Sequence, residues 1–231
     1  MEQKIDYNAL LLQVMAHDLL APLTAVKWQL ELLNRDNIDT AKRNEYLQHL
    51  GESTELGISL TKHAHVAGRV LVGAYQSDNA MYSLPTILEG AAKALQSQYE
   101  RHGVTLELSF DAEPQNRQFD KELAGLFIWA LAKYFLSCVP AQTAVSMRGM
   151  EASSDREGVY VIICSASNVP EVDACVSVFN SQEARGAYDE AFVFARLVHD
   201  VAQLLGITVS ANRQGNGLLV EATCGSVAVA Q

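Results

Sequence analysis

The sequence has no clustered cysteines. Its four cysteines, Cys138, Cys164, Cys175 and Cys224, are scattered over 231 residues, with no Cys-x-x-Cys pair and no histidines at metal-ligand spacing. This distribution argues against a zinc site and against a disulfide framework. We therefore expect free thiols in a reducing cytoplasm.

A signal peptide and a long apolar run are also missing. The first six residues have neither the basic flank nor the apolar stretch of an export signal. The most hydrophobic run, Leu123 to Val139, is interrupted by Lys133 and is marginal for a membrane span of about 20 residues. We expect a buried helix there, no membrane association and a cytoplasmic location.

Positive charge is scarce, with 17 basic against 27 acidic side chains and a formal net charge of −10. Binding to a phosphate backbone needs clustered Lys and Arg, so nucleic acid is excluded as an expected partner. Residues 1–70 hold 7 basic and 9 acidic side chains, and residues 71–231 hold 10 basic and 18 acidic side chains. The excess of acid makes the C-terminal part an unfavourable host for a polyanion such as ATP.

The first segment with a regular pattern runs from about Tyr7 to Asn34. It has no glycine and one proline, and its apolar residues recur at helical steps of three and four. They are Leu12, Met15, Leu19, Leu23, Val26, Leu30 and Leu33. A second apolar set that includes Trp28 widens this stripe, which indicates a helix with more than one neighbour.

A weaker helical pattern over residues 41–70 follows a polar turn, in which Asp39 or Thr40 could cap the second helix. A short connection between two helices predicts an antiparallel hairpin. Since a lone hairpin cannot bury both of its faces, we expect two chains to pair into a four-helix bundle.

The rest of the chain predicts an α+β fold with helices on one face of a mixed sheet. Helices are expected at residues 84–101, 120–138 and 191–205, the last ending at Gly206. Strands are expected at residues 104–110, 144–150, 159–164, 207–211 and 218–224, with a turn at 212–217. The predicted domains are a hairpin at 1–71, a linker at 72–80 and a sandwich at 81–231.

One stripe of the first helix differs from its apolar faces. It contains Gln13, His17, Leu20, Thr24, Lys27 and Glu31 at steps of three and four. His17 should therefore point to water, where an imidazole that titrates near neutral pH can act as a nucleophile and later as a leaving group. A histidine on an amphipathic helix is more often structural, so the neighbouring residues decide between the two interpretations.

Two neighbours favour a functional histidine. The carboxylate of Asp18 could reach the near ring nitrogen and fix the tautomer, although a solvated helix acid is the commoner role for an isolated Asp. Pro22 cannot donate a hydrogen bond to the carbonyl of Asp18, so we expect the helix to bend or loosen within about one turn of His17. The other histidines, His49, His63, His65, His102 and His199, are interpreted as structural or solvated.

The segment His-Asp-Leu-Leu-Ala-Pro-Leu, which begins at His17, resembles the phosphorylation motif of sensor histidine kinases, His-Glu/Asp-x-x-Thr/Asn-Pro-Leu. His17, Asp18, Pro22 and Leu23 match it. Leu20 stands where Arg is common, and its exposed apolar group would suit docking against a protein. Ala21 stands where the family has the Thr or Asn associated with dephosphorylating a partner, so the resemblance does not extend to phosphatase activity.

The resemblance continues over residues 79–231, in the element order of the family's ATP-binding domain. Its metal-coordinating Asn falls on Ala130, which offers no oxygen to Mg²⁺. Its adenine-contacting Asp falls on Cys164, and its glycines fall on Ala166 and Asn168. A second glycine-rich box is replaced by Glu190–Phe194, in which Phe192 and Phe194 would fill the space that a phosphate loop needs.

The combination resembles a kinase-like histidine phosphotransferase, a dimer with a degenerate ATP domain. This resemblance implies phosphoryl transfer between His17, aided by Asp18, and receiver-domain aspartates of response regulators. The expected partner contacts are Gln13, Leu20, Ala21, Thr24 and Lys27. No cofactor of its own is expected, and Mg²⁺ would come with the receiver. The alternatives are a non-transferring pseudokinase module that sequesters its partners and, third, an unorthodox ATP-dependent kinase.

Overall fold

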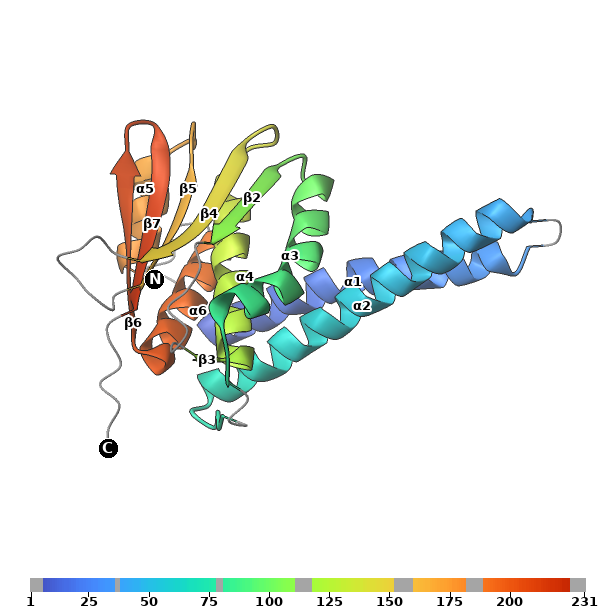
Figure 1. Cartoon of the computed structure of the whole chain (residues 1–231), viewed down its shortest axis with the longest axis horizontal. Coiled ribbons are helices and arrows are strands. Elements are labelled where there is room, and N and C mark those ends of the chain that lie inside the picture. The colour runs from blue at the N-terminus through green and yellow to red at the C-terminus, as the bar shows by residue number, and fades with distance from the viewer. Residues whose placement is uncertain are drawn as a thin grey trace. The chain divides into compact units, whose positions relative to one another are not determined.

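The computed structural model describes residues 6–35, 38–77, 81–110, 118–151, 160–181 and 189–224. The chain divides into two compact units, Met1–Arg69 and Val70–Gln231. The first is a helical hairpin and the second is a mixed α/β domain (Figure 1). Residues 78–80 of the expected linker and Val159, the expected start of a strand, lie outside the described residues.

The hairpin is built from α1 (Tyr7–Leu33) and α2 (Thr40–Leu71), which run antiparallel side by side (Figure 1). Both predicted helices are confirmed to within one residue or two. α1 continues without a break through Pro22, so the expected loosening of the helix beside His17 is not observed. The buried ring of Pro22 faces Gly57 of α2, where an added Cβ would lie 3.9 Å from the Pro22 Cβ.

Each helix of the hairpin begins with an aspartate cap. The Asp6 carboxylate accepts a hydrogen bond from the Asn8 N–H at 3.0 Å and so satisfies a donor that the first turn of α1 leaves open. The Asp39 carboxylate accepts from the Lys42 N–H at 2.8 Å. The sequence left Asp39 and Thr40 as alternative caps for α2, and the structure assigns this role to Asp39.

The second unit is organised around a five-stranded mixed sheet of order β2-β4-β5-β7-β6. β2 pairs parallel to β4, and the other neighbours pair antiparallel. The strands are β2 (Thr105–Phe110), β4 (Ala144–Glu151), β5 (Tyr160–Ala166), β6 (Ile207–Gln214) and β7 (Gly217–Cys224). Two short strands, β1 (Met81–Tyr82) and β3 (Phe119–Asp120), form a separate antiparallel pair.

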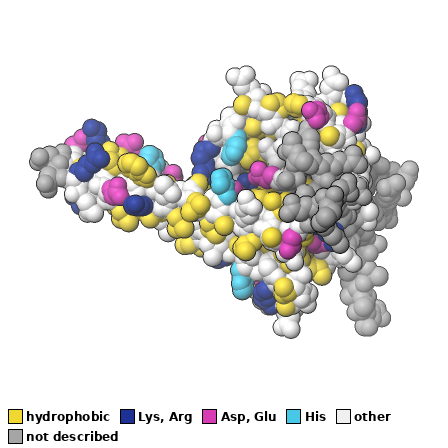
Figure 2. Space-filling model, turned by 180° about the vertical axis from the view of Figure 1, so that it is seen from behind, with side chains coloured by type: hydrophobic (Ala, Val, Ile, Leu, Met, Phe, Trp, Pro, Cys, Tyr) yellow, Lys and Arg dark blue, Asp and Glu magenta, His cyan; other side chains and the backbone are white. Residues whose placement is uncertain are grey.

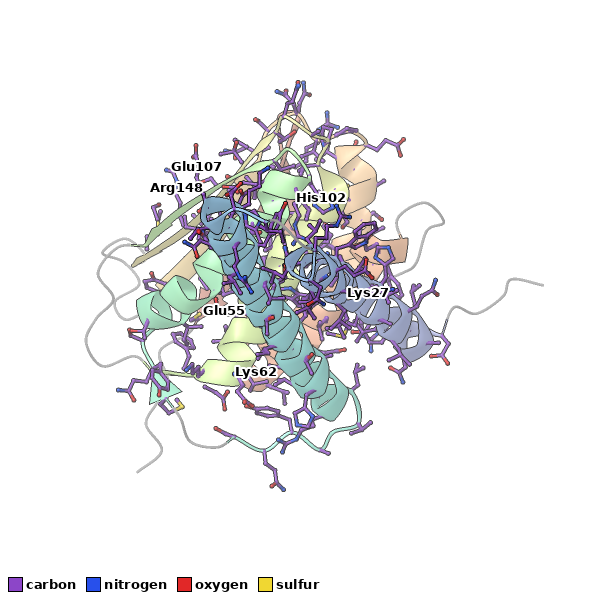
Figure 3. All side chains as sticks on the ribbon, turned by 90° about the vertical axis from the view of Figure 1, so that its right-hand side faces the viewer. Lys27, Glu55, Lys62, His102, Glu107 and Arg148 are labelled. Atoms are coloured by element: carbon purple, nitrogen blue, oxygen red, sulfur yellow. The ribbon has the colours of Figure 1, made fainter. Side chains whose placement is uncertain are left out.

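A layer of helices covers one face of this sheet (Figure 1). The helices are α3 (Leu84–Arg101), α4 (Lys121–Cys138), α5 (Val172–Ser181) and α6 (Asp189–Leu205). The Tyr99 hydroxyl of α3 donates to the carbonyl of Ala132 at 2.6 Å, and the Tyr134 hydroxyl of α4 donates to the carbonyl of Cys175 at 2.8 Å. Exposed polar side chains such as Glu107 and Arg148 lie on the opposite face of the sheet (Figure 3).

α4 is the core helix of this layer. Thirteen of its 18 residues are buried, which confirms the prediction that the apolar run around Leu123–Val139 is a core helix. Among the described residues, α1 is the one helix long and apolar enough to cross a membrane, by a criterion that core helices and signal sequences also meet. The sequence did not single out α1 in this respect.

Three elements were missed and one turn was misjudged. α5 and the strands β1 and β3 were not predicted, and the expected six-residue turn at 212–217 is a two-residue loop, because β6 and β7 extend to Gln214 and Gly217. The predicted end of α6 at Gly206 is confirmed by its positive φ of 67°.

Asp120 joins several parts of the second unit. It belongs to β3, and its carboxylate accepts from the Leu123 N–H at 2.9 Å at the start of α4 and from the Tyr75 hydroxyl at 2.8 Å. Burial raises the pKa of Asp120, but hydrogen bonds from Leu123, Ser77, Tyr75 and Glu122 together lower this pKa below its ordinary value of 3.8.

We predict that Asp120→Ala lowers the free energy of unfolding by about 1–2 kcal/mol, because α4 loses its cap and Tyr75 loses its acceptor. A folded-state pKa below the unfolded one gives stability that is present above the unfolded pKa and lost as pH falls through the folded pKa. The free energy of unfolding of wild type should therefore exceed that of Asp120→Asn by more at about pH 7 than at about pH 3, as measured in urea titrations. An equal difference at both pH values would contradict this role.

Candidate functional site

His17 is placed on the exposed surface of α1. Its side chain is 85% exposed, as the helical spacing predicted. α1 is a continuous helix around it, so the backbone holds the position of the imidazole while the ring remains open to solvent. A partner protein can therefore reach His17 without any change in the hairpin.

Asp18 lies beside the ring with 17% of its side chain exposed. The distance from His17 Nδ1 to Asp18 Oδ1 is 3.8 Å, which is longer than the 2.7–3.2 Å or so of a hydrogen bond but within the range of an ion pair. Since Nδ1 is the nitrogen nearest to Asp18, Nε2 lies on the far side of the ring.

The predicted partner-contacting residues share this open surface. Gln13, Leu20, Ala21, Thr24 and Lys27 are all exposed. Leu20, at 61% exposure, places an apolar side chain one turn from His17. Lys27, labelled in Figure 3, lies 3.9 Å from the Glu31 carboxylate, one turn further along α1. The face thus combines an imidazole, an apolar contact and a paired cation.

Trp28 belongs to the same face, although the sequence interpretation placed it in an apolar stripe for bundle packing. Its side chain is 57% exposed. Trp28 follows His17 by eleven residues, which at about 100° per residue places the two side chains within about 20° of each other around the helix axis. Leu12, Leu23 and Leu30 point about 120–140° away from His17 around the same axis. The spacing of eleven was visible in the sequence and could have placed Trp28 on the same face of the helix as His17.

A second exposed surface on the hairpin is apolar. It consists of Leu12, Leu23 and Leu30 of α1 and of Leu47 and Ile58 of α2. Since Pro22 faces Gly57 and the helices run antiparallel, both groups lie on the same side of the hairpin. Apolar side chains are visible along the hairpin in Figure 2. We call this set the leucine face.

In the second unit, the position that the kinase resemblance assigns to a metal ligand is apolar. Ala130 is completely buried on α4. Cys164, at the position assigned to the adenine-contacting Asp, is completely buried on β5, and burial raises the pKa of its thiol well above the ordinary value. Neither side chain can supply a carboxylate or amide oxygen to Mg²⁺ or to an adenine ring.

The residues that replace the second glycine-rich box belong to the helix α6. The ring of Phe194 is completely buried and meets the Trp129 ring of α4 edge-on, with centroids 5.4 Å apart. The ammonium group of Lys133 lies 5.4 Å from the Phe194 ring centroid and 3.9 Å from the Glu190 carboxylate. Side chains of α4 and α6 therefore pack directly against one another. Phe194 occupies space in this contact, as its size in the sequence suggested.

The turn that contains Ala166 and Asn168, the positions that the resemblance assigns to glycines, has an unusual backbone conformation. Asn168 has a φ of 55°, in the left-handed region that glycine adopts freely and asparagine tolerates. Across the turn, a Cβ on Gly217 would lie 2.5 Å from the carbonyl oxygen of Ala166. The close approach of the two strands is thus provided by Gly217, which the sequence interpretation did not single out.

Two other histidines, His63 and His199, have surroundings that differ from those of His17. Within the described residues, no group of three or more His, Cys, Asp or Glu could hold a metal ion, His63 and His65 included. Burial lowers the pKa of His63 to about 4 and also lowers that of His199, whose Nε2 lies 3.1 Å from the carbonyl oxygen of Phe179. Both rings are therefore neutral at physiological pH, in line with a structural role.

No protein-family model matches the chain, and no curated protein matches it in sequence. Solved structures do match it in three dimensions. The histidine kinase AdeS of Acinetobacter baumannii is 13% identical with a TM-score of 0.54, covering 91% of this chain and 98% of that chain. A structure described as a bacterial phosphotransferase is 13% identical with a TM-score of 0.55, covering 96% and 98%.

A third match covers a smaller share of the chain. The catalytic domain of the histidine kinase ThkA, in a nucleotide-free form, is 8% identical with a TM-score of 0.51, covering 64% of this chain and 96% of that chain. At these identities the likeness concerns the fold. The chain has the histidine-kinase fold, in which a helical hairpin is followed by the α/β domain that binds ATP in kinases.

Proposed function

We propose that this protein is a histidine phosphotransferase of a two-component phosphorelay, which moves a phosphoryl group between His17 and receiver-domain aspartates of response regulators without using ATP. The observation that carries this proposal is the 85% exposed His17 beside Asp18 on the hairpin of a histidine-kinase fold. The buried apolar residues at the nucleotide positions of the second unit support a role without ATP.

In this mechanism, His17 Nε2 attacks the phosphorus of an aspartyl phosphate on the receiver. The N–P bond forms as the bond from phosphorus to the aspartate oxygen breaks, and the carboxylate leaves with the electron pair. The proton on Nδ1 stays on the ring, and Asp18 at 3.8 Å stabilises the positive charge that develops there. The reverse reaction passes the group to a second receiver.

The receiver would bring Mg²⁺, which neutralises charge on the transferring phosphoryl group. This chain contributes a positioned nucleophile, and such transfers depend chiefly on alignment and electrostatics. The surface around His17 supplies that alignment, with Leu20 and Trp28 as apolar contacts and Gln13, Thr24 and Lys27 as polar ones. Ala21 leaves room for a close approach and offers no group to activate water.

We also propose that two chains associate through the leucine face into a four-helix bundle. Contiguous exposed apolar surface is rare on monomers and is buried when helices of this kind pair. The leucine face points away from His17, so pairing would leave both histidines open to receivers.

For His17, we predict that the His17→Gln variant takes up no label from a radiolabelled phospho-receiver, since an amide nitrogen is not nucleophilic. Wild type should gain an acid-labile label, and Asp18→Asn should slow transfer by about 100-fold, the lower end of what one electrostatic stabiliser contributes. Labelling of His17→Gln at the wild-type rate would refute the proposal. A His17→Ala variant that keeps full cellular function would instead favour the sequestering pseudokinase module.

For ATP, we predict no binding heat when Mg-ATP is titrated into the protein in a calorimeter. Ala130→Asn alone should not restore binding, because Phe194 still packs against Trp129 and Cys164 still lacks a carboxylate. Tight binding by wild type would overturn the proposal and favour an ATP-dependent kinase.

For the leucine face, we predict that the double variant Leu23→Glu, Leu30→Glu is a monomer by analytical ultracentrifugation while wild type is a dimer. Charged groups cannot enter a dry helix interface without large cost. Trp28→Glu is the matched control, since Trp28 is similarly exposed but points toward the His17 side, and it should remain dimeric. A monomeric wild-type protein, or a dimer that survives the double variant, would exclude this interface.

A further inference from the structure

The two helices of the hairpin differ in composition. α1 has no glycine, whereas α2 carries Gly51 and Gly57 in its middle. Four of the seven residues 51–57 are Gly, Ser or Thr, which have a lower helix propensity than Ala or Leu. We call residues 51–57 the glycine segment. By composition it is the weak part of an otherwise regular hairpin.

The described structure does not require glycine at either position. Neither Gly51 nor Gly57 has the positive φ that favours glycine. A Cβ added to Gly51 would meet no described atom within 4 Å, and one added to Gly57 would lie 3.9 Å from the Pro22 Cβ, an ordinary van der Waals contact. Alanine therefore fits at both positions. The two glycines lower the helical stability of α2 with no packing gain among the described residues.

Two threonine hydroxyls add to this weakness. Thr54 Oγ1 donates to the carbonyl of Leu50 at 2.7 Å, and Thr61 Oγ1 donates to the carbonyl of Gly57 at 2.8 Å. Hydroxyl groups that bond to the carbonyl one turn earlier compete with the helical N–H donors, destabilise a helix slightly and often bend it. These bonds lie at the two ends of the glycine segment.

Packing within the hairpin does not compensate for the weak helix propensity. The buried residues of α2, Leu60, Val66 and Ala67, all follow the glycine segment. The side chains of the segment itself are exposed or half-buried. Few buried contacts and solvent-exposed backbone hydrogen bonds are the features of regions that open locally, at a cost well below the global free energy of unfolding.

We propose that the glycine segment is a conformational device, which opens locally in α2 while α1 stays helical and holds His17 in place. The opening acts on the leucine face, because Leu47 and Ile58 flank the segment. Their spacing of eleven helical residues places the two side chains within about 20° of each other around the axis, and this alignment is lost when the segment opens.

Pairing of two chains and opening of the segment are thermodynamically linked. A partner that binds the aligned form of the leucine face stabilises that form by mass action and so holds the glycine segment closed. This linkage rests on the proposed pairing through the leucine face. The local opening itself does not, since the composition and contacts of α2 belong to the single chain.

The test is hydrogen exchange of the full-length protein, resolved by residue with NMR. Residues 52–61 of α2 lie level with residues 18–27 of α1, because Pro22 faces Gly57 and the helices run antiparallel. In wild type, the amides of 52–61 should exchange at least about 10-fold faster than those of 18–27 after correction for intrinsic rates. The double variant Gly51→Ala, Gly57→Ala should slow exchange at 52–61 by about 20-fold, or about 5-fold per glycine.

Gly68→Ala serves as the control for this double variant. Gly68 lies on the same helix beyond the segment, and a Cβ added there also meets no described atom within 4 Å. The substitution should leave exchange at residues 52–61 unchanged. Equal exchange rates in the two helices of wild type, or equal slowing by Gly68→Ala, would rule out a local opening. The comparison of the two helices needs no variant.

The linkage is tested with the leucine-face variant Leu23→Glu, Leu30→Glu. At a chain concentration of about ten times the dimer dissociation constant, residues 52–61 should exchange about 10-fold more slowly in wild type than in this variant. Equal rates in a wild-type dimer and in the variant would disprove the linkage. A monomeric wild-type protein would refute the pairing and with it the linkage, whereas the comparison of the two helices in that monomer would still decide the local opening.

Discussion

The helical repeat of α1 constrains what the hairpin can do. Each residue advances by about 100°, so the 27 residues of α1 are distributed among several directions. One direction meets α2, where Pro22 faces Gly57. A second carries the leucine face, and a third carries His17. His17 can stay in water because the contact with α2 is made on another side of the helix.

In the second unit, the same demand for packing decides which side chains occupy the positions that the kinase resemblance assigns to nucleotide contacts. A core helix such as α4 must be covered, and here Phe194 of α6 supplies an aromatic contact to Trp129. Asn168 has a left-handed conformation at a position that the resemblance assigns to glycine. The chain thus has the histidine-kinase fold with the buried core residues Ala130 and Cys164 at two of those positions. Fold and activity are specified by different residues of one domain.

The sequence predicted most of the elements because their signals are local. α1 was recognised from apolar residues at steps of three and four, and α4 was recognised from its long apolar run. α5 was missed because it has only ten residues and contains β-branched residues, which are also common in strands. β1 and β3 have two residues each and exist through their pairing with one another. Such pairing joins residues far apart in sequence, which periodicity cannot detect.

The sequence by itself determined that His17 is exposed and that the positions of Ala130 and Cys164 lack ligand oxygens, because exposure follows from helical period and chemistry from residue type. Only the tertiary structure decided how these residues meet others. It set the 3.8 Å separation of His17 and Asp18, kept α1 unbroken at Pro22, and brought the Tyr134 hydroxyl to the carbonyl of Cys175. Rotamers and contacts between distant segments depend on how the whole core packs, and no local pattern encodes them.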